Sequence, residues 1–498
     1  GPEGTLRVKR EPAELARVEH DLLVIGGGIY GVAAAYEAAS RGLRVALVEA
    51  EDFGAGASWN SLRTIHGGLR HLQRLDLASH RESVRERRLL LRIAPEIVHP
   101  LRFFVPAYGH GLKGRESLRL GLLLDDLLAL DRNEGLPPGQ RLRPGTMLGR
   151  DAALLLVPGL DRQGLAGAAV WHDAQVESSE RLVIAFLRAA VLRGAAAANH
   201  CPATSLLQGA GRVAGALVRD AETGGEHEIR ARFVLNAAGP GADPLLAALG
   251  LRAAGAFRTR LLAMNLLFEG PWPLAERFGV GAWSGGRSLF LVPWRDRVLA
   301  GTDYRPATDT LGPQAVTTFR DELARAFPWA GLEGRRLCLV HRGLVPGEDG
   351  GGGLATRPRI VEHESGNGPA GLVSLQGVKY TTARAVAARA VERVCARLGR
   401  PQGVGEAVPA PLEWARPLEG SLGERVKLAV RDEMARTLGD VVLRRLDLGT
   451  GGPPAPAELD EVARLLAHEL GWDEARVSGE KRELARFYEA AYNGTGNC

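Results

Sequence analysis

Residues 21–31 of the chain read D-L-L-V-I-G-G-G-I-Y-G, and this stretch decides the fold. The run Asp21–Ile25 predicts a short buried strand. Gly26, Gly28 and Gly31 follow in G-x-G-x-x-G spacing, the pattern of a turn that leads from a strand into a helix. The first glycine allows the tight turn, the second clears room for a pyrophosphate, and the third lets helix and strand pack closely.

The residues that follow complete a strand–turn–helix–strand unit. An Ala-rich helix is expected over Val32–Ser40, and a second apolar strand over Leu43–Val48 ends in Glu49. The helix N-terminus would offer N–H groups to the phosphates, and Glu49 would accept hydrogen bonds from ribose hydroxyls. With both strands, the helix and the acid present, the unit indicates a dinucleotide-binding domain.

Two later segments point to a flavin held along the whole chain. Phe233–Pro240 is another apolar strand with a glycine. Gly371–Gly377 precedes Lys379 and the helix-forming run Tyr380–Arg397. A late strand that feeds a helix N-terminus brings positive potential to the end of the ring system where reduction adds negative charge.

Between and after these segments the pattern changes. Arg260–Phe268, Ser288–Trp294 and Val298–Thr302 alternate like strands and are separated by Gly and Pro turns, which predicts an antiparallel sheet. The stretches 422–445 and 457–491 have helical periodicity.

Composition excludes several classes of protein. The chain has 498 residues and a net charge of +5, almost all its cations are arginines, and aromatic residues make up 5% of it, so a nucleic-acid partner is not expected. The four cysteines form no C-x-x-C pair, which argues against a metal site or a disulfide scaffold and fits a reducing cytoplasm. No apolar run is long enough for a membrane span, and no signal peptide is evident.

The chain resembles the FAD-dependent glycerol-3-phosphate dehydrogenase family. The segment 53–72 reads F-G-A-G-A-S-W-N-S-L-R-T-I-H-G-G-L-R-H-L, like the Ser-rich loop and I-H-G-G-L-R-Y-L segment of that family. Further similar pieces, in family order, are Asn236–Pro240, Phe290–Trp294, Gly301–Asp303, Lys379–Thr382 and Ala429–Leu438.

The resemblance implies an α/β fold: a Rossmann-like FAD-binding domain with an inserted antiparallel substrate domain and a C-terminal helical cap. The expected boundaries are a tail at 1–18, FAD-binding parts at 19–110, 166–250 and 356–400, a helical insertion at 111–165, the substrate domain at 251–355 and the cap at 401–498.

The family transfers a hydride from the carbinol carbon of glycerol 3-phosphate to flavin N5 and passes the electrons to a quinone or to oxygen. The resemblance assigns catalytic roles to His66, Arg357 and Lys379. The implied FAD-binding residues are Gly26, Gly28, Gly31, Glu49, Ser58, Ser61, Gly67, Gly68, Gly239, Gly377, Lys379 and Thr381. Peripheral attachment to the inner face of a membrane stays open, with the basic stretch Arg85–Arg92 as a weak signal.

Several positions depart from the family pattern. Val345, in Gly343-Leu344-Val345-Pro346, replaces the arginine that binds phosphate, and Leu262–Asn265 replaces a K-G-S-H segment. Trp59 and Arg63 replace a serine and a lysine of the flavin loop, and Ala383 replaces a tyrosine. His341 or Arg342 would have to compensate for the lost arginine.

Three hypotheses follow from these departures. The first is oxidation of glycerol 3-phosphate. The second is oxidation of a less anionic hydroxy or amino substrate, motivated by the apolar character of Trp59, Met264, Val345 and Ala383. The third is a flavin-binding protein without catalysis, against which the retention of His66 and of the rare Lys379 argues.

Overall fold

The computed structural model describes residues 10–59, 61–72, 74–111, 114–251, 259–307, 312–348, 353–400 and 411–492. The chain forms two compact units, each made of segments that are far apart in the sequence. The segments of unit 1 are 1–59, 178–261 and 344–486, and those of unit 2 are 60–177, 262–343 and 487–498. Relative to the expected boundaries, residues 60–110 and 166–177 therefore group with the substrate-domain strands.

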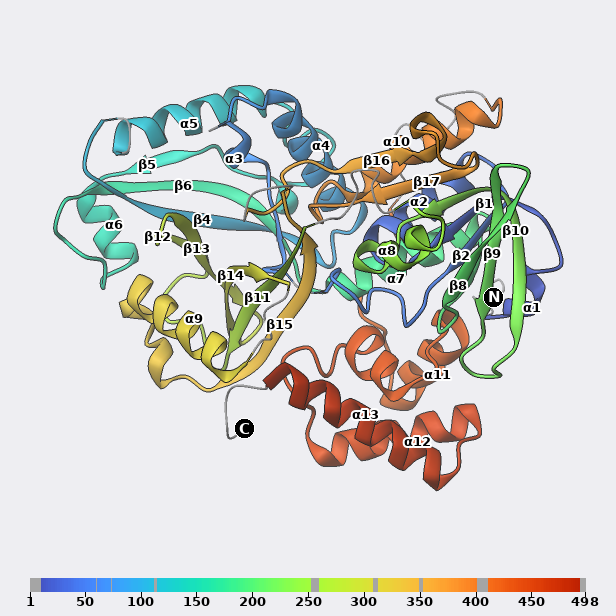
Figure 1. Cartoon of the computed structure of the whole chain (residues 1–498). Helices are drawn as coiled ribbons and strands as arrows, with labels where there is room; N and C mark the ends of the chain where they lie inside the picture. Colours follow the sequence, from blue (N-terminus) through green and yellow to red (C-terminus); the bar gives the residue numbers. More distant parts are fainter. Residues whose placement is uncertain are drawn as a thin grey trace. The chain divides into compact units, whose positions relative to one another are not determined.

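Unit 1 is built on a sheet whose central strands run parallel in the order β17-β10-β1-β2-β7 (Figure 1). An antiparallel strand, β16, closes one edge, and the antiparallel pair β8 and β9 extends from β10. The strand bounds are β1 His20–Ile25, β2 Val45–Val48, β7 Ala196–Ala198, β8 Ala203–Gly209, β9 Arg212–Arg219, β10 Glu226–Asn236, β16 Arg359–Glu362 and β17 Leu372–Gln376.

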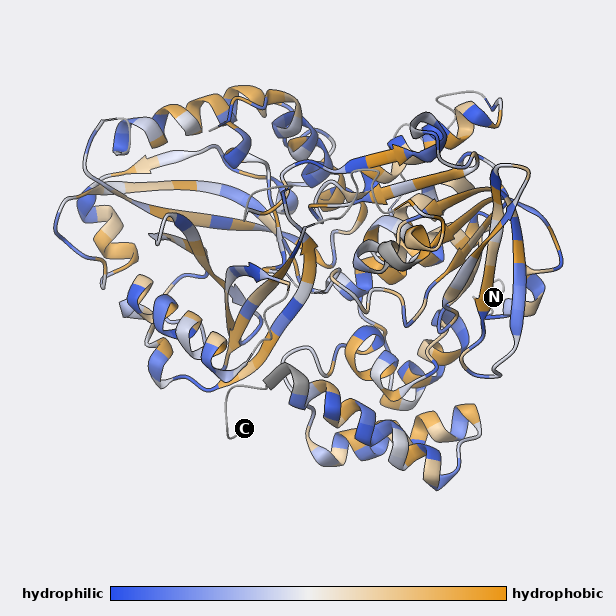
Figure 2. Cartoon of the chain, in the orientation of Figure 1, coloured by the Kyte–Doolittle hydropathy of each residue, from blue (hydrophilic) through white to orange (hydrophobic). Residues whose placement is uncertain are grey.

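The parallel strands are almost wholly apolar because helices cover them, and Figure 2 shows them largely in orange. Helix α2 (Ile29–Ser40) follows β1 and packs against α7 (Ser179–Leu192) and α10 (Ala383–Arg397). The predicted strand–turn–helix–strand unit is thus confirmed. The helix begins three residues earlier than expected, since Gly28 takes the extended conformation at its N-cap.

Unit 2 is built on a sheet in the order β15-β11-β14-β13-β12-β4-β6-β3, with β5 paired to β6. Its predicted strands are confirmed, but the sheet is larger than expected because β3–β6 come from residues before 177. The bounds are β3 Thr64–Ile65, β4 Val98–Tyr108, β5 Thr146–Leu148, β6 Leu165–Val176, β11 Arg260–Phe268, β12 Gly279–Ser284, β13 Arg287–Trp294, β14 Arg297–Pro306 and β15 Leu337–Pro346.

Helices surround this second sheet. The described part of the insertion at 111–165 contains two α-helices, as expected, but also contributes the short strand β5. The helices of unit 2 are α3 Leu69–Leu72, α4 Leu77–Ile93, α5 Arg115–Leu128, α6 Arg150–Leu156 and α9 Pro313–Ala326.

The described part of the C-terminal cap is helical, as predicted, and belongs to unit 1 up to Arg486. The first helical stretch breaks after α11 (Leu422–Glu433), where Met434 takes a left-handed conformation, and resumes as a π-helical turn at Asp440–Arg445. The second divides at Gly471 into α12 (Pro456–Leu470) and α13 (Glu474–Tyr492).

Candidate functional site

Three of the predicted cofactor segments meet at one edge of the unit 1 sheet. Ile25 at the end of β1 pairs with Asn236 at the end of β10, and Asn236 pairs with Ser374 near the end of β17, so the turns after these strands lie side by side. These turns contain Gly26, Gly239 and Gly377. The carboxyl-terminal edge of an open parallel sheet is where such folds bind their ligands.

Two glycines of the first turn are required by the backbone itself. Gly26 has a φ of +106°, and a Cβ there would lie 2.6 Å from the carbonyl oxygen of Ala237. A Cβ at Gly31 would lie 1.7 Å from the carbonyl oxygen of Gly26, so any side chain would push α2 away from β1. Both glycines thus do what the sequence predicted of them.

Gly28 and Ser58 lie at the N-terminus of α2. A Cβ at Gly28 would approach the Ser58 hydroxyl oxygen at 3.0 Å, and this oxygen accepts a hydrogen bond from the N–H of Ile29 at 2.9 Å. Among the described residues outside its own helix and chain neighbours, only the Ser58 hydroxyl oxygen lies within 4 Å of that Cβ position, and such a helix N-terminus fits a pyrophosphate.

Glu49 ends β2 beside this turn. Its two carboxylate oxygens accept hydrogen bonds from the N–H groups of Gly27 and Glu51, the latter at 2.8 Å. Burial raises the pKa of Glu49, and the two backbone N–H groups counteract it. Each oxygen keeps a second lone pair for a further donor, and acceptance of ribose hydroxyls by Glu49 stays a prediction.

The loop between β17 and α10 carries the other predicted cofactor residues of unit 1. A Cβ at Gly377 would lie 2.0 Å from the ring of Tyr30, so this glycine is required by a neighbouring side chain. Lys379 is half-buried and Thr381 is buried. Arg357, before β16, is exposed. These residues lie on the segments where the sequence predicted them. Their contacts with a cofactor stay a prediction.

His66 in unit 2 lies beside a buried carboxylate that the sequence reasoning missed. Its Nδ1 is 3.4 Å from Asp173 Oδ2 on β6, while half of the His66 side chain is exposed. Asp173 also accepts hydrogen bonds from Gly67 N at 2.6 Å, from Trp171 Nε1 at 3.2 Å and from the guanidinium of Arg87. Four donors therefore fix one carboxylate.

The ionisation of Asp173 follows from these contacts. Burial alone would raise its pKa, but the hydrogen bond from His66 and the charge of Arg87 together lower the pKa of Asp173 well below its usual range. Asp173 is therefore an ionised acceptor that orients the His66 ring. The W-H-D sequence at residues 171–173 gave no signal for this, since its partner is 107 positions away in the chain.

The turn after His66 depends on small residues. A Cβ at Gly67 would lie 2.0 Å from Arg87 Nη1, and Gly68 has a φ of +90°. The Ser61 hydroxyl accepts a hydrogen bond from the N–H of Arg63 at 3.0 Å. These three predicted cofactor residues shape the loop that carries His66.

Two substituted positions of the loop have structural partners. The Trp59 indole donates to the carbonyl oxygen of Ala55 at 3.0 Å. Arg63 is fully buried, with its guanidinium 4.5 Å from the centre of the Trp294 ring. Arg63 therefore packs inside unit 2 through a cation–π contact.

The strand β15 carries the lost phosphate arginine position. Alternation along a regular strand places Val340 and Arg342 on one face of β15. His341 and Val345 alternate to the opposite side, where the His341 ring lies 6.5 Å from Trp294. Arg342 therefore does not share a face with position 345, which weakens it as a replacement.

Two of the four apolar substitutions lie in the interior. Met264 belongs to the core cluster under α9, and Ala383 is buried at the start of α10. They are packing residues, contrary to the expectation that all four favour apolar contact with a substrate. Asn265, which replaces a family histidine, accepts a hydrogen bond from the Thr302 hydroxyl at 2.7 Å.

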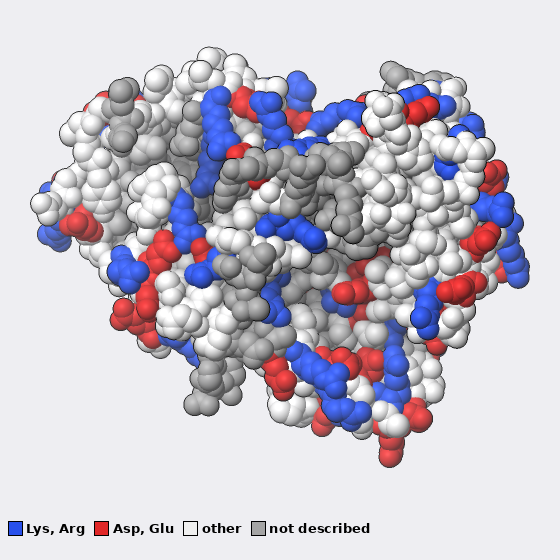
Figure 3. Space-filling model, viewed as in Figure 1, with Lys and Arg blue, Asp and Glu red and all other residues white. Residues whose placement is uncertain are grey.

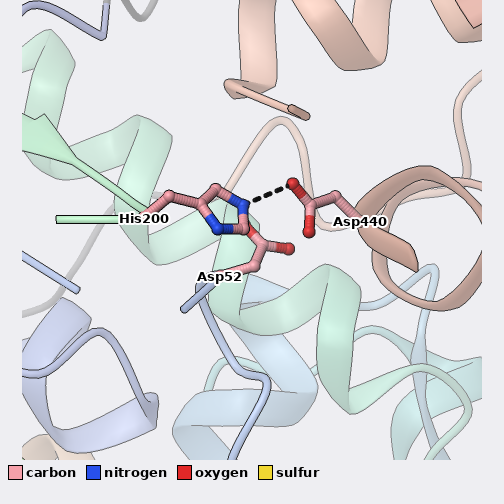
Figure 4. Close-up of side chains that lie close together, drawn as sticks. All are labelled: Asp52, His200 and Asp440. Carbon is pink, nitrogen blue, oxygen red and sulfur yellow. Dashed lines mark hydrogen bonds and ion pairs between the residues drawn. The ribbon is translucent and has the colours of Figure 1, made fainter. Parts of the chain in front are cut away.

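Asp52, His200 and Asp440 lie close together and resemble a set of metal ligands (Figure 4). Arg445 makes two hydrogen bonds of 2.8 Å to Asp52, and Arg444 bridges Asp52 and Asp440. His200 Nε2 is 2.8 Å from Asp440. Because two arginines already neutralise the carboxylates, this cluster is an ion-pair network that fastens the cap to the loop after β2.

Comparison with known proteins agrees with this geometry. Residues 21–393 match the family described as FAD dependent oxidoreductase, and residues 388–477 match the C-terminal domain of alpha-glycerophosphate oxidase. The chain is 29% identical to a glycerol-3-phosphate dehydrogenase of Synechocystis sp., over 96% of this chain and 97% of that protein. It is 31% identical to the mitochondrial glycerol-3-phosphate dehydrogenase of Homo sapiens, over 95% of this chain and 74% of that protein.

The fold is similar to that of a glycerol-3-phosphate dehydrogenase from Bacillus halodurans solved in complex with FAD. The TM-score is 0.71 at 21% sequence identity, and the match covers 98% of both chains. The glycine turns, the open N-terminus of α2 and Glu49 fit FAD, which is the cofactor. The chain is an FAD-dependent oxidoreductase and belongs to the glycerol-3-phosphate dehydrogenase family.

Proposed function

We propose that the protein oxidises the secondary alcohol of glycerol 3-phosphate, with His66 as the base that accepts the hydroxyl proton. The observation that carries the proposal is the His66–Asp173 contact. FAD, when bound, supplies the acceptor for the hydride that leaves the carbinol carbon. The relatives named as glycerol-3-phosphate dehydrogenases support this choice of substrate.

The tautomer of His66 follows from its neighbour. Asp173 is an ionised acceptor, so His66 Nδ1 carries the hydrogen and donates it to Asp173. Nε2 then keeps its lone pair and takes the alcohol proton as the C–H bond breaks. Lys379 and Arg357 are the proposed cations for the anionic groups of cofactor and substrate.

A second candidate keeps the chemistry and changes the substrate. Val345 removes one bidentate cation, and alternation along β15 places Arg342 on the face opposite to position 345. A phosphate dianion that loses such a partner binds more weakly by roughly 30- to 1000-fold. A hydroxy or amino substrate with less charge would not carry this cost.

Anaerobic stopped-flow mixing separates the candidates. Purified holoprotein is mixed with glycerol 3-phosphate or with glycerol while the visible flavin absorption is followed. Fast bleaching by the phosphate, lost in His66→Asn, supports the first candidate. A flavin that dithionite reduces but glycerol 3-phosphate does not bleach removes it, and a screen of uncharged hydroxy and amino compounds then tests the second.

We also propose that the electrons pass to a quinone at a membrane surface, with oxygen as the alternative acceptor. Among the described residues, no helix is long and apolar enough to cross a bilayer. Helix α5 instead lies on the surface with leucines turned outward, and its ribbon is largely orange in Figure 2. The exposed fractions are 58% for Leu123 and 63% for Leu127, whereas Asp125 between them is buried against His80.

The charges beside this helix suit an anionic lipid surface. Arg119 lies on α5, and Arg74 follows α3, which packs against α5; both are exposed, and among the described residues neither makes an ion pair. Glu116, on the same helix, is hydrogen-bonded to His110. The stretch Arg85–Arg92 is not such a surface, since Arg87 is buried within it. Over the face in Figure 3, basic and acidic side chains are interspersed.

Vesicle co-sedimentation tests the membrane proposal. Holoprotein should sediment with anionic phosphatidylglycerol vesicles, and the variant Leu123→Asp/Leu127→Asp should stay in the supernatant. Leu192→Asp, at an exposed leucine of unit 1, is the matched control. Equal sedimentation of all three proteins would contradict the proposal.

A further inference from the structure

The hydroxyl of Tyr30 is enclosed by the loop between β17 and α10. It accepts hydrogen bonds from the N–H groups of Val378 at 3.0 Å and Lys379 at 3.1 Å. It also donates a hydrogen bond to the carbonyl oxygen of Lys379 at 2.6 Å. One side-chain oxygen thus satisfies three backbone groups of the same turn.

The ring of Tyr30 makes a second contact with this loop. A Cβ at Gly377 would lie 2.0 to 2.1 Å from two ring atoms, closer than any real contact. The glycine and the tyrosine therefore fit only as a pair. Tyr30 lies in the first turn of α2 and is half-buried. Its contact with the loop, and not its place in the helix, accounts for this burial.

The two elements that Tyr30 joins are those predicted to bind different ends of FAD. The N-terminus of α2 suits the pyrophosphate of FAD. The loop after β17 presents Lys379, the cation assigned above to the flavin ring. Since a hydroxyl fixed at three points holds this loop rigidly, it sets the spacing between the two ends of the cofactor site.

We propose that Tyr30 is a positioning residue for FAD, which locks the turn at Gly377–Lys379 against the pyrophosphate-binding turn of α2. In the alternative case, the N–H groups of Val378 and Lys379 bind the cofactor directly, and the Tyr30 hydroxyl competes with the cofactor for them. Removing the hydroxyl weakens FAD binding in the first case and strengthens it in the second. The prediction about FAD affinity does not depend on which substrate the protein oxidises. The prediction about Lys379 rests on the proposed function.

Reconstitution of apoprotein with FAD tests the first part, with the dissociation constant measured from flavin fluorescence. Tyr30→Phe should raise this constant roughly 10-fold, because two N–H groups lose their acceptor. Tyr36→Phe is the matched control, since Tyr36 lies on the same helix and packs on Phe186. An unchanged or lower dissociation constant in Tyr30→Phe, with the control unaffected, would overturn the proposal.

A double-mutant cycle guards against a trivial folding defect. Gly377→Ala should abolish FAD binding in the native background and be tolerated in Tyr30→Ala, because the ring it strikes is gone. Independent, additive losses would refute the coupling. Thermal midpoints of the four apoproteins show whether each one folds.

The midpoint potential of bound flavin tests the part that concerns Lys379. A displaced cation stabilises the added negative charge less, so Tyr30→Phe should shift the potential to more negative values. The shift should vanish in a Lys379→Met background. A shift that persists without Lys379 would refute this part, and because no substrate is used, failure of the substrate proposal would leave the result intact.

Discussion

Replacing Asp173 by asparagine removes one charge without changing the shape of the side chain. The first consequence concerns stability. The Arg87 side chain is 3% exposed and pairs with Asp173, so the variant leaves a guanidinium buried without its counter-charge. Breaking one side of a buried pair costs about 3–5 kcal/mol.

The second consequence concerns the His66 ring. In Asp173→Asn the residue can turn an N–H toward His66 Nδ1, which stabilises the tautomer whose Nε2 already carries a hydrogen. A base whose lone pair is turned away loses its share of catalysis, about 10²–10⁴-fold in the rate of flavin reduction. The glycine turns of unit 1 that bind FAD should be unaffected, whereas Gly67, a predicted cofactor residue of unit 2, keeps only a neutral acceptor for its N–H.

A double variant separates the two effects. Asp173→Asn/Arg87→Met removes both charges, so thermal unfolding of the apoprotein should recover most of the lost stability while flavin reduction stays slow. The assay is anaerobic stopped-flow reduction across pH 6–9 beside a thermal melt. Recovery of both stability and rate in the double variant, or a rate within threefold of the native protein in Asp173→Asn, would refute the orienting role.

Three further outcomes are expected. Gly31→Ala should lose at least tenfold in FAD occupancy, measured by absorbance of purified protein, whereas Gly56→Ala, where among the described residues no atom lies within 4 Å of the new Cβ, should match the native protein. Burial lowers the pKa of His200, but the hydrogen bond to Asp440 raises it overall, so the stabilisation is present below a pH of about 6.5 and is lost as the pH rises through the folded value. Melting curves should therefore show the largest gap between native protein and His200→Gln in mild acid, and a gap that widens with pH would contradict this. Val345→Arg should lower KM for glycerol 3-phosphate roughly 30-fold or more with kcat unchanged, and an unchanged KM would show that position 345 does not face the phosphate.

The fold of unit 1 could be predicted because its signals are local. The strand, the glycine turn, the helix and Glu49 all lie within about 30 residues. The later strands were confirmed as β10 and β17 because a parallel strand buried on both faces is an apolar run that sequence alone reveals.

The second sheet shows where such reasoning ends. Strand β4 pairs with β6 on one side and with β12 on the other, and nothing local in residues 98–108 says which distant strands it joins. Pairing across more than a hundred residues depends on the whole fold, not on periodicity. For the same reason the sequence did not reveal the contact between His66 and Asp173. The break at Met434 was missed on other grounds, because a residue other than glycine takes a positive φ there.

The site was predicted best where a residue acts through the backbone. Gly26 and Gly31 have the steric roles assigned to them. Gly377 was assigned to the cofactor by resemblance, but its need for glycine comes from the Tyr30 ring. A motif identifies the position and leaves open which neighbour makes it necessary.

The scattered make-up of the two units has a consequence for biosynthesis. Strand β1 pairs with β10, and β10 with β17, so one side of the central sheet of unit 1 stays incomplete until residue 376 has been made. At a synthesis rate of about 5–20 residues per second, roughly 10–40 s pass between the synthesis of β1 and that of its partner β10. During that time an apolar strand edge is available to other nascent chains, so we expect newly made protein to depend on chaperones and on early capture of FAD.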